Sequence, residues 1–273
     1  MRASSAQTLH AATRTLRTVF AQEHVDAMAA AENLFGLSDL ARKSRRVRGA
    51  ISDPSRSGED KEAFVQNLLR GGVQDATVKI AQTLARGTWS SADDVADVFE
   101  LLGMQAVLEA AVLAGVLEQT QKELHQVQAL LVDERELRNA LSDLGVGSAH
   151  DRAHFAARLL DGHVNQYTSR LVRRAVRLSV HGRLTARLHH IIDLAANRQK
   201  QRVAEVTVAR PLSAQQQTRL QSILERKHGG SVTLNVMVDP DLMGGMRIVM
   251  GSEAVNATVR SEIRQARRAM VGK

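Results

Sequence analysis

The chain of 273 residues contains no cysteine, three prolines and seven aromatic residues. Without cysteine it has neither disulfides nor a thiolate for catalysis or metal binding. So few prolines leave room for long helices. A core with few aromatic side chains must be built from Leu, Val, Ile and Ala, which suits helix packing better than a β-sandwich. These absences argue against an all-β fold and predict a mainly helical protein.

Long apolar runs are also absent: none reaches the roughly 18 to 20 residues of a membrane span, so we expect no bilayer crossing. The first 22 residues contain three arginines and no acid, a composition shared with targeting segments. We favour a first amphipathic helix instead, because Leu9, Leu16, Val19 and Phe20 recur at near-helical spacing.

Positive charge is concentrated in the last quarter of the chain. Residues 1–196 contain 24 Lys and Arg against 23 Asp and Glu, whereas residues 197–273 contain 13 against 6. Such a segment meets an acidic protein surface, nucleic acid or anionic lipid, or is simply a soluble face. The sequence leaves these possibilities open.

An internal repeat organises the first two thirds of the chain. The stretch from Val47, "VRGAISDPSRSGEDKEAFVQNLLRGGV", aligns with "LRNALSDLGVGSAHDRAHFAARLLDGHV" from Leu137 with one gap. The identical pairs include Arg48 with Arg138, Ser57 with Ser148, Phe64 with Phe155, and Gly71 with Gly162. We interpret this as a duplicated helical module of about 90 residues, with the first module at 1–104 and the second at 105–196.

The two copies differ most in one helix. "QDATVKIAQTLARGTW" in the first copy corresponds to the much more basic "NQYTSRLVRRAVRLSVHGRL" in the second. The basic helix either docks an acidic helix or exposes its arginines to solvent.

The pattern changes in residues 197–273. Strands are predicted at 203–209, 232–238 and 246–250, a helix at 213–227 and a final helix at 256–270. The segment "DPDLMGG" from Asp239 supplies the turn before the third strand, because proline fixes one dihedral angle and glycines permit unusual ones. The fold class is therefore mainly α, with duplicated helical bundle modules followed by a small α/β domain of order β-α-β-β-α.

No pattern for catalysis or ligand binding stands out. The chain has no GxxxxGK[ST] phosphate loop and no GxSxG nucleophile elbow. His150 and His154 are four residues apart, but no HExxH motif or carboxylate cluster accompanies them. We expect no catalytic, cofactor or metal site. A basic nucleic-acid-binding scaffold is the alternative function, favoured by charge alone, since the basic last quarter lacks aromatic residues for stacking.

The C-terminal motifs resemble a known family. "PLSxxQ" begins the predicted helix and "VDPxLxGGxxI" connects the last two strands, an arrangement similar to the C-terminal domain of the delta subunit of F-type ATP synthases, called the oligomycin-sensitivity-conferring protein in mitochondria. The family usually has an acid and a glycine at the positions of Asn256 and Ala257. The residues that carry the resemblance are Pro211, Leu212, Ser213, Gln216, Val238, Asp239, Pro240, Leu242, Gly244, Gly245, Ile248 and Gly251.

The resemblance extends to residues 169–195, which look like the last two helices of the family's six-helix N-terminal bundle. Ordinary members are shorter by about one repeat, so this chain looks like a long form with a duplicated module. The family implies a non-enzymatic stator subunit without cofactor. Its bundle grips N-terminal helices of alpha subunits on the catalytic head, which also contains beta subunits, and its C-terminal domain holds the C-terminal helices of the b subunits.

The resemblance also implies one copy per complex, peripheral to the membrane, without nucleic acid. We expect the cytoplasmic side of a bacterial membrane, with the mitochondrial matrix less favoured. For the alpha-subunit groove the candidates are Leu9, Leu16, Val19, Phe20, Leu171, Val172, Ala175 and Val176, each of which could equally belong to the core. For the b contact they are Arg260, Arg264, Arg267 and Arg268. The turn residues Asp239, Pro240, Leu242, Gly244 and Gly245 are expected to be structural.

Overall fold

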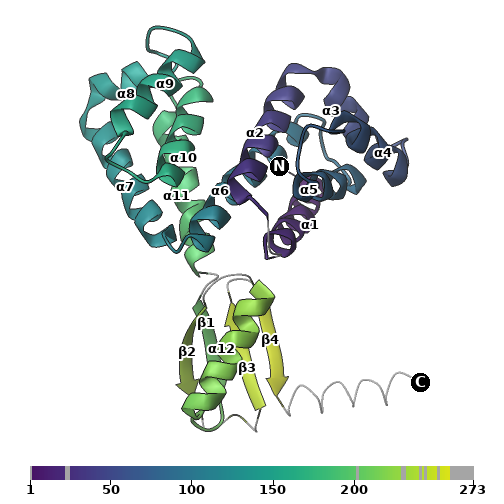
Figure 1. Cartoon of the computed structure of the whole chain (residues 1–273), viewed down its shortest axis with the longest axis vertical. Coiled ribbons are helices and arrows are strands. Elements are labelled where there is room, and N and C mark those ends of the chain that lie inside the picture. The colour runs from purple at the N-terminus through teal and green to yellow at the C-terminus, as the bar shows by residue number, and fades with distance from the viewer. Residues whose placement is uncertain are drawn as a thin grey trace. The chain divides into compact units, whose positions relative to one another are not determined.

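A computed structural model describes residues 2–21, 25–200, 203–228, 232–239, 242, 245–250 and 253–258. The chain divides into two compact units, Met1–Asp193 and Leu194–Lys273. The first is helical and the second contains a sheet (Figure 1). The predicted fold class, mainly α with a small α/β domain, is confirmed.

The helical unit is built from helices joined by short turns. Its longest members are α1 (Ala3–Phe20), α2 (Ala27–Lys43), α6 (Asp94–Leu113) and α7 (Leu117–Asp133), and α11 begins at Leu184 and ends at Lys200. The shorter helices are α3 (Arg45–Ser52), α4 (Gly58–Leu68), α5 (Asp75–Arg86), α8 (Arg135–Leu141), α9 (Ala149–Leu160) and α10 (Gln166–Arg177).

The sequence repeat corresponds to a repeat of elements. The bounds of α7 lie 90 residues after those of α2, and the bounds of α10 lie 91 residues after those of α5. Packing repeats as well: α4 lies against α5 as α9 lies against α10, and α2 contacts α3 as α7 contacts α8. The two copies therefore fold related but divergent sequences into the same order of helices.

One helix belongs to both copies. Helix α6 begins 91 residues after α1 and 90 residues before α11. It packs on α1 and α2 as the last helix of the first bundle and on α10 and α7 as the first helix of the second (Figure 1). Because it is covered from both sides, 15 of its 20 residues are buried. The predicted module boundary at 104/105 falls inside this shared helix.

Two side-chain arrangements recur at matching positions. Arg48 donates to the carbonyl oxygens of Ala41 and Arg42 at 2.7 and 3.0 Å, and Arg138 donates to those of Leu131 and Val132 at 2.8 and 3.0 Å. The donated bonds satisfy carbonyls that the end of a helix leaves without an intrahelical partner.

The second arrangement is a pair of helix caps. The hydroxyl oxygens of Ser57 and Ser148 accept from the backbone N–H of Asp60 and Asp151, at 3.1 and 3.2 Å. These bonds satisfy donors at the start of α4 and α9 that have no intrahelical acceptor.

The α/β unit contains a four-stranded sheet of order β2-β1-β3-β4. Strand β1 (Val203–Val208) is parallel to β2 (Thr233–Val238) and antiparallel to β3 (Gly245–Met250). Helix α12 (Ala214–His228) connects β1 to β2. Its start has the predicted Ser and Gln in a reciprocal cap: Ser213 N–H donates to Gln216 Oε1 at 2.9 Å, and Gln216 N–H donates to Ser213 Oγ at 3.2 Å.

The core of this unit lies between the helix and one face of the sheet. Alternate residues of β1 point into it because side chains alternate along a strand, and Leu224 of α12 packs against them. The buried members are Ala204, Val206, Val208, Leu224, Val232 and Met250.

The predicted final helix is partly wrong. Residues 256–258, expected to begin it, belong instead to a fourth strand, β4 (Glu253–Thr258), which pairs antiparallel with β3. The exposed backbone edge of β3 offers a ladder of hydrogen bonds that overrides helical periodicity here. The rest of the predicted helix, 259–270, lies outside the described residues.

If the two copies are equivalent, the helix caps of Ser57 and Ser148 should contribute equally to the free energy of unfolding. We expect Ser57→Ala and Ser148→Ala each to lower the free energy of unfolding by about 1 kcal/mol, because each removes the acceptor for one helix-terminal N–H. Urea denaturation followed by circular dichroism measures this. Thr18→Ala is the control, since its exposed hydroxyl donates only within α1 to the Arg14 carbonyl. A cost confined to one of the two serines would contradict the equivalence.

Candidate functional site

The two bundles are joined by a buried arginine. Arg174 of α10 is 2% exposed and donates through Nε to Glu100 Oε1 of α6 at 2.8 Å. Its terminal nitrogens donate to Asp39 of α2 at 2.8 and 3.1 Å. Ser38 Oγ donates to Glu100 at 3.0 Å and to the Ala96 carbonyl at 2.9 Å. A single guanidinium thus binds two carboxylates on helices of the first bundle, one of which is α6.

Arg174 is the centre of a row of arginines one turn apart on α10. Arg170 binds Glu32 of α2, with a 2.8 Å bond from its terminal nitrogen to Oε2, and Arg177 donates to Asp39 at 3.0 Å. Of the two alternatives for this basic helix, docking is observed within the chain: its arginines bind the two acids of α2, a helix that also contains Arg42 and Lys43 and is not acidic overall.

The ring of Phe35 lies between these charges and α6. The guanidinium carbons of Arg170 and Arg174 are 4.5 and 4.7 Å from its centroid, within the range of cation–π attraction. A Cβ on Gly103 of α6 would lie 2.6 Å from atoms of the same ring. The absence of a side chain at this position is what lets α2 approach α6 closely.

Charge and burial act against each other at the junction. Burial alone would lower the pKa of Arg174, but hydrogen bonds and charges from Glu100 and Asp39 outweigh it and raise that pKa. Burial would likewise raise the pKa of Asp39, and the bonds and charges of Arg174 and Arg177 hold it below its usual value. The charged forms are therefore the stable ones when the bundles are docked.

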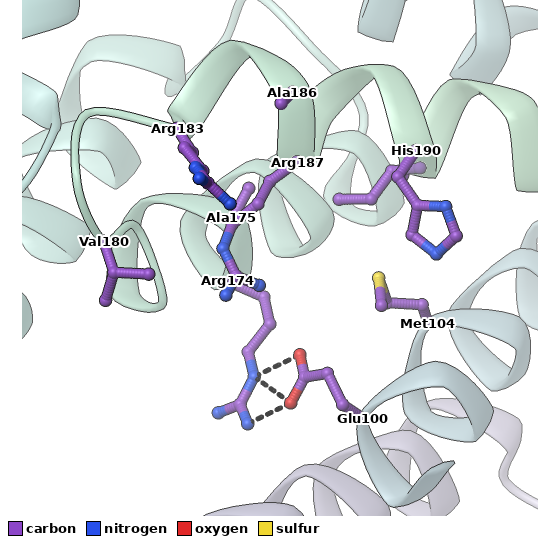
Figure 2. A pocket seen from close by; sticks show the side chains of 10 residues that line it. Glu100, Met104, Arg174, Ala175, Val180, Arg183, Ala186, Arg187 and His190 are labelled. Atoms are coloured by element: carbon purple, nitrogen blue, oxygen red, sulfur yellow. Dashed lines mark hydrogen bonds and ion pairs between the residues drawn. The ribbon is translucent and has the colours of Figure 1, made fainter. Parts of the chain in front are cut away.

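A pocket of about 250 Å³ opens beside this junction, between α6, α10 and α11 (Figure 2). Met104, Ala175 and Ile191 give it an apolar lining. Arg187, which is partly buried, also lines it and forms no ion pair with another described residue. Burial, together with the charge of Arg42, lowers the pKa of Arg187. The pocket combines apolar and cationic surface, which suits an amphipathic acidic segment.

Most of the residues predicted for an alpha-subunit groove are in the interior. Leu9 is partly exposed, whereas the other seven are at most 5% exposed: Leu16, Val19, Phe20, Leu171, Val172, Ala175 and Val176. The structure also separates the two sets, because α1 packs on α5 and α6 while α10 packs on α6, α7 and α9. They lie in different bundles rather than on the two sides of one groove.

The remaining predicted residues belong to the α/β unit. Asp239 N–H donates to the Val208 carbonyl at 2.9 Å, Leu242 N–H donates to the Asp239 carbonyl at 3.1 Å, and Gly245 has φ of 83°. These features close the turn against β1 and need glycine at its end. Pro240, Gly244 and the predicted b-contact arginines Arg260, Arg264, Arg267 and Arg268 lie outside the described residues.

The junction was not predicted from the sequence, although its arginines were noted as a basic helix. Glu100 falls among apolar residues of α6, and a charged residue inside an otherwise buried helix is the signal that could have pointed to it. Asp39 and Glu32 give no such signal, because α2 also has exposed positions, where an acidic residue is expected in any helix.

Two searches of the described residues complete the description. No group of three or more His, Cys, Asp or Glu side chains among them is placed to hold a metal ion. None of the described helices is long and apolar enough to cross a membrane.

Comparison with known proteins identifies relatives over the whole chain. Residues 104–270 match the family model for the ATP synthase delta (OSCP) subunit. The ATP synthase subunit delta of Beutenbergia cavernae is 38% identical over 272 residues, covering 100% of both chains. That of Kineococcus radiotolerans is 34% identical over 97% of this chain and 95% of its own, and that of Streptomyces griseus 33% over 100% of both. The family match begins inside α6, whereas these relatives align with the first bundle as well.

Replacing Arg174 should leave the buried carboxylate of Glu100 without its counter-charge. We expect Arg174→Gln to lower the free energy of unfolding by about 3 to 5 kcal/mol, because Glu100 would remain buried without its counter-charge. Denaturation followed by the fluorescence of Trp89, the single tryptophan, measures the change. Arg158→Gln on the exposed surface of α9 is the control, with an expected effect below about 0.5 kcal/mol.

The double variant Arg174→Leu with Glu100→Leu separates charge from packing. Since it removes both members of the buried pair, it should recover at least half of the loss. A double variant as unstable as Arg174→Gln would contradict the assignment of the loss to an unpaired carboxylate.

Two glycines test the close approach of α2 to α6. We expect Gly103→Ala to destabilise the helical unit by about 1 to 3 kcal/mol, because the added methyl group would overlap the buried Phe35 ring. Gly36→Ala is matched to it: it also lies within a helix, but a Cβ there meets nothing within 4 Å, so it should stabilise by up to about 1 kcal/mol. Thermal unfolding measures both, and equal stabilisation by the two changes would exclude the steric constraint.

Proposed function

The chain belongs to the ATP synthase delta (OSCP) subunit family, and we propose that it links the alpha subunits of the catalytic head to the b subunits of the peripheral stalk. Members of this family are structural subunits of the ATP synthase and not enzymes by themselves. In the proposed role the chain keeps the head from turning with the rotor of a proton-translocating enzyme. The observation that carries the proposal is the full-length alignment with ATP synthase delta subunits.

The physical requirement of such a link is resistance to bending under load. The helical unit meets it in two ways: α6 is built into both bundles, and the buried Arg174 pairs connect α10 to α2 and α6. A relative movement of the bundles would separate Arg174 from the buried carboxylate of Glu100 and from the partly exposed carboxylate of Asp39. This cost favours motion as one body over hinging.

We place the b-subunit contact on the C-terminal unit. Residues 197–273 contain 13 Lys and Arg against 6 Asp and Glu, a charge that would attract acidic C-terminal helices of b subunits. Arg260, Arg264, Arg267 and Arg268 remain the candidates for this contact, from sequence alone. Opposite charge across the contact would speed docking and fix its orientation.

We place the alpha-subunit contact on the helical unit, which would receive the N-terminal helices of alpha subunits beside the beta subunits of the head. Of the groove candidates, Leu9 of α1 is the partly exposed one, so it remains the candidate for direct contact, whereas the other seven belong to the cores of the two bundles. The proposed assembly contains one copy of the chain, peripheral to a bacterial membrane on its cytoplasmic side.

Charge reversal tests the b contact. We expect R260E/R264E/R267E/R268E in the full-length chain to weaken binding to the soluble part of the b subunit by about tenfold or more, because four rim charges together contribute roughly 1.4 kcal/mol. Calorimetry at two salt concentrations measures the loss and its salt dependence. The matched control, R45E/R70E/R135E/R158E, makes the same change in net charge on exposed arginines of the helical unit.

An equal loss in both variants would show that only net charge matters and would remove the assigned contact.

The wider proposal is tested by native mass spectrometry of the tagged chain purified from detergent-solubilised membranes. Recovery of alpha, beta and b subunits with one copy of the chain is the expected result. Recovery with nucleic acid and no ATP synthase subunits would overturn it.

A further inference from the structure

A second cavity, of about 360 Å³, lies where α9 and α10 of the second bundle face α2 of the first. It is distinct from the pocket beside α11. The polar residues that line it are Glu32, His150, His154, Arg170, Arg173 and Arg177. Nitrogen donors therefore dominate the lining, with a single carboxylate among them.

The carboxylates near the cavity are already engaged. Glu32 is bound by Arg170, and Asp39 by Arg174 and Arg177. Burial would raise the pKa of Glu32, but the bond from Arg170 and the charges of Arg170, Arg173 and Arg174 keep it below its usual value. Glu32 is thus a fixed anion that neutralises one of the arginines.

Arg173 is left without a carboxylate of its own. Among the described residues it forms no hydrogen bond or ion pair, and its Nε is buried without an acceptor. A buried donor with no acceptor costs free energy, and the cost is larger when the group is charged. Arg173 also lines the cavity, so an anion bound there would pair with its charge.

Two histidines complete the donor set. His150 and His154 lie one turn apart on α9, with ring centroids 4.5 Å apart in an edge-on arrangement. Asp151, which lies between them in the sequence, is engaged in the helix cap, where its carboxylate accepts from the N–H and the hydroxyl of Ser148 at 2.9 and 2.7 Å. Each ring retains a nitrogen able to donate.

We propose that this cavity binds a phosphate-type oxyanion, either inorganic phosphate or the phosphate groups of a nucleotide, through Arg173, His150 and His154. A phosphate presents several acceptor oxygens and matches the planar donor fork of arginine. Arg170 and Arg177 add positive charge at the rim. A carboxylate, with two oxygens, would satisfy fewer of the donors that converge from the two helices.

The first copy of the repeat lacks this donor set. At the matching positions, 91 residues earlier, it has Glu59 for His150, Ala63 for His154 and Gln82 for Arg173. The same helical arrangement therefore folds without arginine or histidine at these three positions. The substitutions His154→Ala and Arg173→Gln consequently remove the site with side chains that the fold already accepts.

The test uses the isolated full-length chain and is independent of the proposed subunit contacts. Calorimetry and thermal unfolding are measured with phosphate, ADP or ATP against chloride at equal ionic strength. We expect saturable binding and a rise in Tm that follows ligand concentration. Binding by H154A/R173Q should be at least about tenfold weaker, while the surface control R158Q should bind as the unchanged chain does. Tighter binding of ATP or ADP than of phosphate identifies a nucleotide as the source of the phosphate groups.

Circular dichroism checks that each variant folds, and R173Q alone replaces the double variant if that one does not. The proposal is overturned if the unchanged chain shows no saturable binding up to about 10 mM of any of the three anions. It is also overturned if H154A/R173Q responds as strongly as R158Q, since general screening of charge would then account for the effect.

Discussion

The helical unit depends on the burial of one guanidinium group. Arg174 loses its hydration on folding, and the carboxylates of Glu100 and Asp39, together with the ring of Phe35, compensate for that loss. The arrangement also fixes the register of α2 against α10. Moving α2 by one turn would bring Phe35 or Lys43 to the position of Asp39, and neither can bind a cation there as a carboxylate does. The junction thus admits one relative placement of the two bundles.

Duplication gave this chain two bundles that share a helix rather than two separate domains. Sharing α6 explains why that helix is apolar on nearly all sides and why Gly103 is needed where the Phe35 ring approaches it. The ordinary unit of the family corresponds to the second bundle with the α/β domain, and the first bundle extends it through a continuous core.

The two copies share the same arrangement of helices but differ in charge. Caps and arginine clamps recur at matching positions, because they satisfy the ends of helices that both copies need. By contrast, α10 of the second copy contains four arginines, whereas the matching α5 of the first copy contains one. Some of them hold the first bundle in place, and Arg173 lies in the cavity beside α9. Divergence on a fixed frame is how a stator subunit can add stiffness and a ligand site without a new fold.

Local signals in the sequence predicted the mainly helical class, the repeat, the first three strands and the helix that begins after Ser213. These features depend on residues close in the chain, so periodicity and turn chemistry predict them. The fourth strand escaped prediction because its pairing with β3 outweighs the local helical pattern. The burial of Leu171 and Val176, the separation of α1 from α10 and the partners of Arg174 were decided by tertiary structure alone. Arg174 and Asp39 are 135 residues apart, and only the packing of α2, α6 and α10 brings their charges into contact.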